Sequence, residues 1–551
     1  MTGPLLTLLN APAIAAFAAA GFWGDETIYH LAVRQARTTP RAWAVRDRRR
    51  RLSYAELVAV ADRLAAHLAG HGIRTGHRIA VWLPSRVETA IALLACSRNG
   101  YVCCPSLHRD HTVGEIVVLV DRVRAAALIA QPGYGADADR HDVFAELAGR
   151  DFLRCAWRVS SAEAVPFGEL TGPAREMEAS KDANQVMYLP FTSGTTGEPK
   201  GVMHSDNTLL ATARMMVRDW RLKHAVLYTL SPLSHNLGLG ALVTALAAGG
   251  ELVIHDLTRG ESLLDRLHET GAEFLFGVPT HAIDLLAEAR ARGARHLGTV
   301  RGFRISGVAA PAPVAAELMD YGIVPQSGYG MTETCSHQYT LPDDPPERII
   351  ESCGRACAGY EIRVWRQDDS DIEAAPGEIG EIGGRGASLM LGYFDDQKAT
   401  EAAFNAQGWF MTGDLGWIDE AGYLRLSGRK KDVIIRGGRN IHPARIEALA
   451  MRHAAVEKAA AFPVGDARLG ERVCLAVVAR RDMRLDPQAI LEHFDAFGLS
   501  RYDMPEFILP LSEMPLTASG KLLKRELVRR VAEGELRPVP VRFRSSSPVR
   551  G

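Results

Sequence analysis

The stretch that decides the fold of this chain is Thr192-Ser193-Gly194-Thr195-Thr196-Gly197-Glu198-Pro199-Lys200-Gly201. It follows an extended run, Val186–Phe191. Its glycines let a backbone approach a ligand closely, while its hydroxyl groups and Lys200 supply donors and positive charge for phosphate oxygens. It is not a Walker A loop, because Pro199 precedes the lysine and Gly201 follows it. The stretch therefore predicts a different phosphate-binding loop at the end of a strand.

The residues around this loop alternate between helical and β-rich patterns. Tyr54–Gly70 has the spacing of an amphipathic helix, and Glu88–Arg98 reads as a second helix. Arg78–Leu83 and Tyr101–Cys104 have the composition of strands. Such alternation predicts βαβ units and mainly parallel sheets. Nearby, Gly238-Leu239-Gly240 lacks the third glycine of a dinucleotide fingerprint, so no such site is predicted there.

The pattern changes after the parallel part of the chain. Glu361–Leu426 contains short strands separated by Gly turns, which predicts a small antiparallel sub-region. A polar break follows at Ser427–Asp432. Beyond it a compact α+β stretch is predicted, with helices near Pro443–His453 and Pro487–Phe497, strands at Lys458–Phe462 and Arg472–Ala479, and a last helix from Lys521.

We therefore predict an α/β protein of two domains. The large N-terminal domain, residues 1–428, would hold stacked, mainly parallel βαβ sheets and the small antiparallel sub-region. Residues 429–431 would connect it to a small α+β C-terminal domain, residues 432–537. The Pro-, Ser- and Arg-rich tail, residues 538–551, is expected to be disordered.

Composition narrows the classes of function. The formal net charge is -1, so no overall field favours nucleic acid or an anionic membrane. The first 24 residues carry no charged side chain, and the first arginine is Arg34, so a signal peptide is not predicted. Pro4, Asn10 and Pro12 interrupt the apolar run, which argues against a spanning helix. We expect this segment to pack on the body of a cytoplasmic protein.

Further motifs follow one another along the chain, and together with the loop they carry a resemblance. They are Leu52-Ser53-Tyr54-Ala55-Glu56-Leu57, Tyr329-Gly330-Met331-Thr332-Glu333, Gly380-Glu381-Ile382 with Arg385-Gly386, Thr412-Gly413-Asp414, Gly428–Asp432 and Thr517–Lys521. The chain resembles the acyl-adenylate-forming (AMP-binding) superfamily of acyl-CoA synthetases, peptide-synthetase adenylation domains and beetle luciferases. The resemblance spans roughly residues 25–535. It implies that ATP and a carboxylic acid react to an acyl-adenylate with Mg²⁺, and that coenzyme A then takes the acyl group.

The resemblance also implies nucleotide-binding roles for individual residues. Asp414 would accept hydrogen bonds from both ribose hydroxyls, with Arg429 supporting it. Tyr329 would stack on adenine, and Glu333 would ligate Mg²⁺, a hard ion that prefers oxygen ligands. The other contacts would come from Thr192, Ser193, Gly194, Thr195, Thr196 and Lys200 on the phosphates, Thr196 on the metal as well, and from Gly307, Val308, Ala309, Gly328 and Gly330 around the base.

Five further positions match the family's catalytic and moving parts, and the resemblance implies that residues 429–431 are a hinge and that the small C-terminal domain is mobile. Lys521 would bridge the carboxylate and the α-phosphate, a task that suits a point charge on a long stem. Thr332 would hydrogen-bond the α-phosphate. Lys431 matches the hinge about which the small domain rotates between half-reactions. Gly437 and Gly438 would leave room for the pantetheine arm of coenzyme A, because glycine has no Cβ.

The acid is expected to bind beside His235, the candidate gate residue. Asn236, Phe276, Gly277 and Met331 complete the predicted acyl pocket. The pocket stretches contain no Lys or Arg, which favours an uncharged, hydrophobic acid. The chain is most similar to ligases of the cyclohexanecarboxylate and medium-chain acid type. Val308 replaces a usual glycine, and Asn236 after His235 is also found in aryl-acid adenylating enzymes, so a hydroxylated aromatic acid stays open.

Three functions compete at this point. The first is an acyl-CoA ligase, and the second is a stand-alone adenylating enzyme that loads a carrier protein. The third is a non-catalytic homologue, which the presence of Glu333, Asp414, Arg429 and Lys521 argues against. The expected partners are a small carboxylic acid, ATP and coenzyme A, without nucleic acid or stable membrane insertion. A homodimer is compatible with the sequence.

Overall fold

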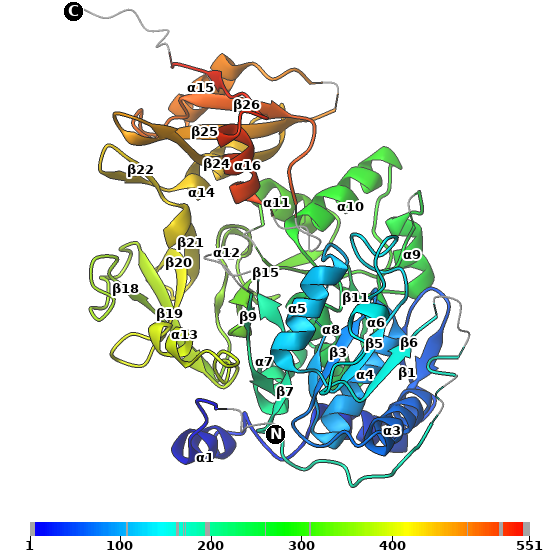
Figure 1. Cartoon of the computed structure of the whole chain (residues 1–551). Helices are drawn as coiled ribbons and strands as arrows, with labels where there is room; N and C mark the ends of the chain where they lie inside the picture. The colour runs from blue at the N-terminus through cyan, green and yellow to red at the C-terminus, as the bar shows by residue number, and fades with distance from the viewer. Residues whose placement is uncertain are drawn as a thin grey trace, which may run out of the picture.

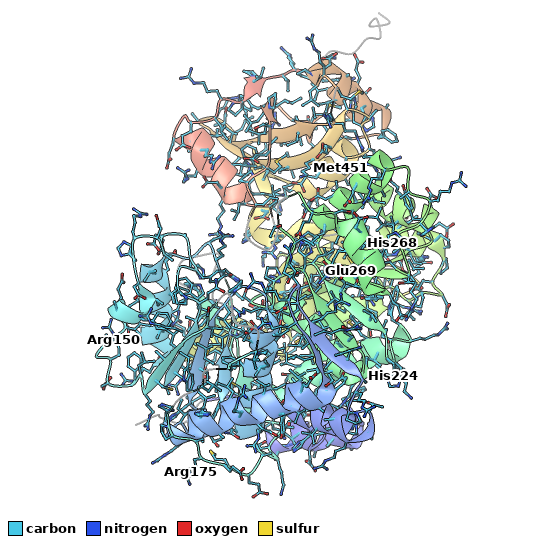
Figure 2. The ribbon with its side chains drawn as sticks, turned by 90° about the vertical axis from the view of Figure 1, so that its right-hand side faces the viewer. Arg150, Arg175, His224, His268, Glu269 and Met451 are labelled. Carbon is cyan, nitrogen blue, oxygen red and sulfur yellow. The ribbon has the colours of Figure 1, made fainter. Side chains whose placement is uncertain are left out.

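A computed structural model shows the fold. It describes residues 6–105, 108–160, 165–168, 170, 172–192, 199–258, 260–307, 310–481, 483–516 and 522–543. Over these residues the chain forms a large α/β body and a smaller upper domain built from the C-terminal part of the chain (Figure 1). A view turned by 90° shows the same two parts, with Met451 at the lower edge of the small domain (Figure 2). The predicted mixed fold class is confirmed.

The larger of the two parallel sheets has nine strands in the order β17-β16-β15-β14-β13-β11-β12-β1-β2. From β1 to β15 its neighbours pair parallel, and β2, β16 and β17 add antiparallel edges. The strands are β1 (Trp43–Arg46), β2 (Arg51–Ser53), β11 (Val226–Thr229), β12 (Glu251–Ile254), β13 (Phe274–Gly277), β14 (Gly302–Ile305), β15 (Val324–Met331), β16 (Cys335–Tyr339) and β17 (Arg355–Ala356).

The second sheet has six strands in the order β10-β7-β4-β3-β5-β6. All its pairs are parallel except that of β10 with β7. Its strands are β3 (Arg78–Trp82), β4 (Val102–Cys104), β5 (Ala127–Ala130), β6 (Cys155–Arg158), β7 (Val186–Tyr188) and β10 (His204–Ser205). The predicted parallel βαβ organisation is therefore present in both sheets.

The main core lies where helices of the two sheets meet. Helices α4 (Val87–Asn99) and α8 (Asn236–Ala248) are buried along almost their whole length, as expected of helices that are apolar on all sides. Helix α3 (Tyr54–Gly70) has the predicted bounds, since Ser53 and Glu56 form a capping box at its start. The other long helices of this body are α2 (Ile28–Thr38), α5 (Val113–Val123), α7 (Asp206–Asp219), α9 (Leu263–Thr270), α10 (Pro279–Ala291) and α11 (Ala312–Asp320).

The predicted antiparallel sub-region is a four-stranded meander. Strands β18 (Tyr360–Trp365), β19 (Gly380–Gly386), β20 (Phe410–Ile418) and β21 (Leu424–Arg429) pair in chain order, each antiparallel to the next. The last pair places Asp414 opposite Arg429. This register brings together two residues that the sequence separates by a hairpin.

The small domain follows directly after β21. One turn of 3-10 helix, Lys430–Asp432, leads into the hairpin of β22 (Ile434–Arg436) and β23 (Arg439–Ile441). The remaining elements are α14 (Pro443–Ala450), β24 (Val456–Asp466), β25 (Gly470–Ala479), α15 (Pro487–Ala496), β26 (Phe507–Leu511), α16 (Lys524–Ala532) and β27 (Val539–Pro540). The predicted hinge, residues 429–431, falls at this connection and stays a prediction.

The expected disorder from residue 538 is wrong for the first residues of the tail. Strand β27 (Val539–Pro540) pairs with β26, and Val541 N donates to Glu506 O at 2.9 Å. A proline is acceptable there because an edge strand has one side without ladder bonds. Composition alone did not reveal this pairing.

The N-terminal segment reaches the body through Trp23. Its Nε1 donates to Ala387 O at 2.8 Å, and Phe17 and Phe22 pack nearby. Helix α1 (Ala11–Ala19) itself has no buried residue. None of the helices among the described residues combines the length and apolar character needed to cross a membrane.

Candidate active site

The predicted phosphate loop is closed at its base by a short antiparallel pair. Strand β8 (Phe191–Thr192) pairs with β9 (Lys200–Gly201), so Thr192 lies opposite Lys200. The tip, with the predicted ligands Ser193, Gly194, Thr195 and Thr196, lies outside the described residues. Lys200 extends its ammonium group over the ring of Tyr393, 4.7 Å from the ring centre.

Residues 390–394, which we call the strap, connect this loop to the predicted metal ligand. On one side Phe394 N donates to Gly201 O at 2.7 Å. On the other side Met390 N donates to Glu333 O at 2.7 Å, and the hydroxyl of Tyr393 donates to Glu333 Oε1 at 3.0 Å. The strap therefore holds Lys200 and Glu333 near each other, although it belongs to neither of the two sequence motifs that contain them.

Glu333 is a buried carboxylate in a positive field. Only 6% of it is exposed, and burial raises its pKa above the ordinary range. The hydrogen bond from Tyr393 and the charges of Lys200 and Arg429 act the other way and lower that pKa. Within the described part of the chain Glu333 forms no salt bridge. An oxygen ligand in this state fits a divalent cation such as Mg²⁺, which would offset the cost of burying the charge.

Asp414 is held by an arginine and a tyrosine. Arg429 Nε lies 3.1 Å from Asp414 Oδ1, and the hydroxyl of Tyr329 donates to Asp414 Oδ2 at 2.9 Å. Burial and the charge of Asp414 raise the pKa of Tyr329 far above its ordinary value, so the phenol stays a neutral donor. Tyr329 is 5% exposed and packs beside Ile382 and Leu424. Its predicted stacking on adenine stays a prediction.

The two glycines beside Tyr329 have a structural reason that the sequence did not indicate. A Cβ on Gly330 would lie 1.9 Å from Cys335 O on the neighbouring strand. A Cβ on Gly328 would lie 2.8 Å from the guanidinium carbon of Arg304. Both glycines are thus required by the close approach of neighbouring groups. Three other residues were predicted to surround the adenine base. Gly307 has a φ of +95°, and Val308 and Ala309 lie outside the described residues.

His204 is a positioning residue that the sequence analysis did not select. It is fully buried, and burial lowers its pKa to about 4, so the ring is neutral. Nε2 lies 2.7 Å from Thr332 O, a pure acceptor, and therefore donates to it. Nδ1 is then an acceptor and lies 3.0 Å from the hydroxyl oxygen of Thr208, which also lies 3.0 Å from Ser205 O. The ring fixes the backbone of Thr332, one residue before Glu333, but a lone histidine in the sequence carries no sign of this.

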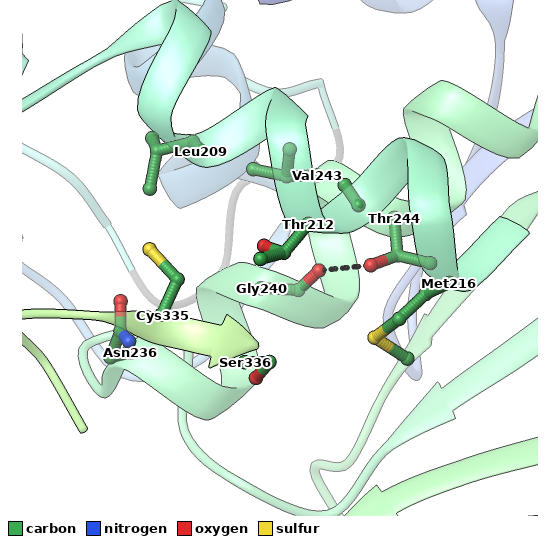
Figure 3. Close-up of a pocket in the computed structure, with 10 residues that line it drawn as sticks. Leu209, Thr212, Met216, Asn236, Gly240, Val243, Thr244, Cys335 and Ser336 are labelled. Carbon is green, nitrogen blue, oxygen red and sulfur yellow. Dashed lines mark hydrogen bonds between the residues drawn. The ribbon is translucent and has the colours of Figure 1, made fainter. Parts of the chain in front are cut away.

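The acyl end of the predicted site contains one small pocket (Figure 3). It lies between α7, α8 and β16, and among the five predicted acyl residues only Asn236 lines it. Its walls are Leu209, Thr212, Ala213, Met216, Asn236, Gly240, Val243, Thr244, Cys335 and Ser336.

The other predicted acyl residues lie around this pocket in different roles. His235 caps α8, since its Nδ1 accepts from Leu237 N at 3.3 Å. Phe276 is 1% exposed in the core between the sheets, and a Cβ on Gly277 would meet the ring of His281 at 2.9 Å. Met331 packs toward the cluster that includes Tyr393 of the strap. These four residues do not line the pocket of Figure 3, and their part in binding the acid stays a prediction.

The predicted residues of the small domain lie on its connecting turns. Gly437 and Gly438 have φ values of +57° and +81° and form the turn between β22 and β23, a conformation that favours glycine. Lys431 belongs to the 3-10 turn at the border, where burial and the charge of Arg429 lower its pKa. Lys521 lies outside the described residues, next to Leu522, which pairs with Leu516.

Comparisons with known proteins agree with this architecture. A family described as "AMP-binding enzyme" matches residues 32–394, and "AMP-binding enzyme C-terminal domain" matches residues 445–521. The medium-chain fatty-acid–CoA ligase of Escherichia coli K12 is 31% identical over 94% of both chains. A feruloyl-CoA synthase of Amycolatopsis is 32% identical over 90% of this chain and 98% of its own. The ATP-bound structure of MatB from Rhodopseudomonas palustris has a TM-score of 0.81 at 27% identity, covering 92% of this chain and 99% of that one.

The two-part fold and the two matching family models define an adenylate-forming class of enzyme. The chain belongs to the AMP-binding enzyme family. It is an acid–thiol ligase, as the sequence predicted, and ATP and coenzyme A are substrates in keeping with the family.

Proposed function

We propose that this protein is an AMP-forming acyl-CoA ligase that activates a hydrophobic, alicyclic or medium-chain carboxylic acid. The observation that carries the proposal is the convergence at Glu333. One buried carboxylate is bonded to Tyr393, lies in the field of Lys200, and also lies in the field of Arg429, which holds Asp414. Cations and donors so arranged offset the repulsion between a carboxylate and a triphosphate.

The reaction divides into two steps in this proposal. In the first, a carboxylate oxygen attacks the α-phosphorus of ATP, and the bond to pyrophosphate breaks. Lys200 neutralises charge on the leaving phosphates, Asp414 orients the ribose, and Lys521 brings acid and α-phosphate together. Mg²⁺ at Glu333 and Thr196 would supply further neutralising charge when bound. In the second step the thiol sulfur attacks the acyl carbonyl, the thiol proton is lost to solvent, and AMP leaves.

The acid is assigned from the pocket and from the relatives. Leu209, Ala213 and Met216 give its wall an apolar character, and no Lys or Arg lines it. The named activity of the Escherichia coli relative concerns medium-chain fatty acids, and that of the Amycolatopsis relative concerns an aromatic acid. Both kinds share an uncharged tail, which is the property that this pocket selects.

The domain arrangement supports the thiol step. Residues 1–428 and 432–537 would act as the body and the lid, with residues 429–431 as the hinge and Lys431 as the residue that absorbs the rotation. Gly437 and Gly438 would then face the pantetheine arm. We place the enzyme in the cytoplasm, where ATP and coenzyme A are available together, and we consider a homodimer compatible with its surface.

The proposal is tested by pyrophosphate release with ATP over linear, alicyclic and aromatic acids, each with and without coenzyme A. A cognate acid should release pyrophosphate, and coenzyme A should then convert the accumulated acyl-AMP to the thioester. Absence of pyrophosphate with every acid would contradict the proposal. An adenylate that persists in the presence of coenzyme A would favour loading of a carrier protein instead.

A further inference from the structure

The pocket between α7, α8 and β16 has a lining of apolar side chains mixed with a few polar ones. Two hydroxyls, those of Thr212 on α7 and Ser336 on β16, belong to its lining. No hydrogen bond joins either hydroxyl to another group among the residues that the structure describes. Thr212 is 5% exposed, so its hydroxyl has little access to bulk water. Figure 3 shows its side chain near the middle of the lining residues.

The state of Thr212 differs from that of two other helical threonines, Thr244 and Thr270. The hydroxyl of Thr244, in the same pocket, donates to Gly240 O at 2.7 Å, four residues back in α8. The hydroxyl of Thr270 likewise donates to Arg266 O at 2.8 Å. This backward bond is the ordinary way for a helical threonine to satisfy its hydroxyl. Thr212 does not form it, so its donor and acceptor capacity is directed to the pocket.

The pocket is small, so any group that enters it lies close to the hydroxyls of Thr212 and Ser336. In this structure it has room for little more than one water molecule near these hydroxyls. A water there would bridge Thr212 and Ser336, and a polar atom of a ligand that displaces it must reproduce its hydrogen bonds to keep affinity. A purely hydrocarbon tail would leave the buried hydroxyl of Thr212 and the half-buried one of Ser336 unpaired, which is unfavourable.

We propose that the acid carries a hydroxyl or keto group remote from its carboxylate, and that Thr212 and Ser336 recognise it. This inference rests on the proposed function and narrows its substrate class. The water-sized space would hold the single polar substituent beside the two hydroxyls and near Leu209, Ala213 and Met216, and the carbon skeleton would lie at the open side of the pocket. Thr212 and Ser336 are therefore specificity-determining residues, separate from the groups that bind ATP.

The test compares matched pairs of acids that differ in one polar group. Suitable pairs are 4-hydroxycyclohexanecarboxylate with cyclohexanecarboxylate, and 3-hydroxybenzoate with benzoate. The measured quantity is the ratio of kcat/KM within a pair, from pyrophosphate release by the full-length enzyme. We expect the oxygenated acid of at least one pair to be preferred about tenfold or more, because a site built for a hydroxyl rejects the analogue that lacks it.

Two isosteric variants separate recognition from packing. Thr212→Val should bring the ratio of kcat/KM, oxygenated acid over unsubstituted acid, close to one. The unsubstituted acid should keep or gain activity. Thr270→Val is the matched control, because its hydroxyl is bonded within α9 and does not line the pocket, and it should leave the ratio as in the natural enzyme. Ser336→Ala should lower the ratio by severalfold.

Two results would overturn the inference while the proposed function stands. One is active enzyme with a ratio near one for every pair, and the other is a Thr212→Val variant that keeps the natural ratio. A structural role alone would lower the rates of both acids equally and leave the ratio unchanged. If no acid of any class released pyrophosphate, the proposed function itself would fail, and this inference with it.

Discussion

The two ends of the candidate site differ in how firmly their polar groups are held. At the nucleotide end Glu333, Asp414 and Thr332 each have a defined partner, namely Tyr393, Arg429 and His204. At the acyl end the hydroxyls of Thr212 and Ser336 line a pocket without a bond to another described group. ATP is the same molecule whichever acid is activated, so the groups proposed to bind it can be held in fixed positions. The acid end keeps hydrogen-bonding capacity for its ligand, which is how one fold serves different acids.

The largest expected effect comes from removing charge at the fixed end. Glu333→Gln keeps the size of the side chain but removes the charge that a cation would balance, so we expect adenylation to fall by about 10²–10³-fold. Pyrophosphate release across a Mg²⁺ titration measures this. Glu361→Gln, at an exposed carboxylate paired with Arg385, is the control and should stay within twofold of the natural enzyme. A Glu333→Gln enzyme with full activity at every Mg²⁺ concentration would remove this residue from the metal site.

The second expected effect concerns the predicted hinge, residues 429–431, between the large domain and the small domain. Lys431→Pro fixes φ in the predicted hinge, so thioester formation from preformed acyl-AMP should fall about 10–100-fold while adenylation changes little. Single-turnover measurements of each half-reaction provide the comparison. Lys431→Ala keeps the backbone free and should leave both half-reactions nearly unchanged. Equal losses in the two half-reactions of the proline variant would show that residues 429–431 are not the hinge.

A third change weakens one bond at the nucleotide end and alters its pH dependence. The hydroxyl of Tyr393 stabilises the charged form of Glu333, so it lowers the pKa of that carboxyl. Tyr393→Phe should raise this pKa further, and activity should then be lost at a higher pH as the solution is acidified. We expect a rate about 5–10-fold lower at neutral pH.

The rate–pH profile of adenylation measures that shift. Tyr423→Phe removes a comparable bond, to Asp344 at 2.7 Å, away from Glu333, and it should leave the acid limb in place. An acid limb unmoved in Tyr393→Phe would mean that another group governs it.

The smallest effect is expected within α8. A Cβ on Gly240 would meet no atom within 4 Å, so Gly240→Ala should stabilise the helix by up to about 1 kcal/mol and narrow the pocket. The apparent Tm should rise by about 1–3 °C, and the KM for the bulkiest accepted acid should rise severalfold. Gly238→Ala is the opposite control, because its Cβ would lie 2.2 Å from Pro232 O and should lower the Tm. Equal Tm shifts for the two variants would contradict this account of α8.

The sequence was most informative where one short segment carries a structure by itself. The amphipathic spacing of Tyr54–Gly70 placed helix α3, and the Gly turns placed the meander that ends at Arg429. The family motifs also identified the class of enzyme. These features depend on neighbours within a few residues, so the pattern is visible without a fold.

Contacts between distant segments could not be predicted in this way. Tyr393 bonds Glu333 sixty residues away, and His204 bonds Thr332 across an even longer separation. The burial of Phe276 in the core likewise follows from the register of the large sheet, and its predicted place beside the acid stays a prediction. The same holds for β27, whose pairing with β26 only the folded chain can show.

The strap, residues 390–394, acts as a spacer that sets the distance between the loop lysine and the acidic metal-ligand candidate. Its backbone bonds at Gly201 and Glu333 fix both ends of that spacing within five residues. Length changes in the chain should therefore be tolerated unequally. A one-residue insertion within the strap would shift one end against the other, whereas an insertion at the exposed turn near Gln407 would leave both ends in register.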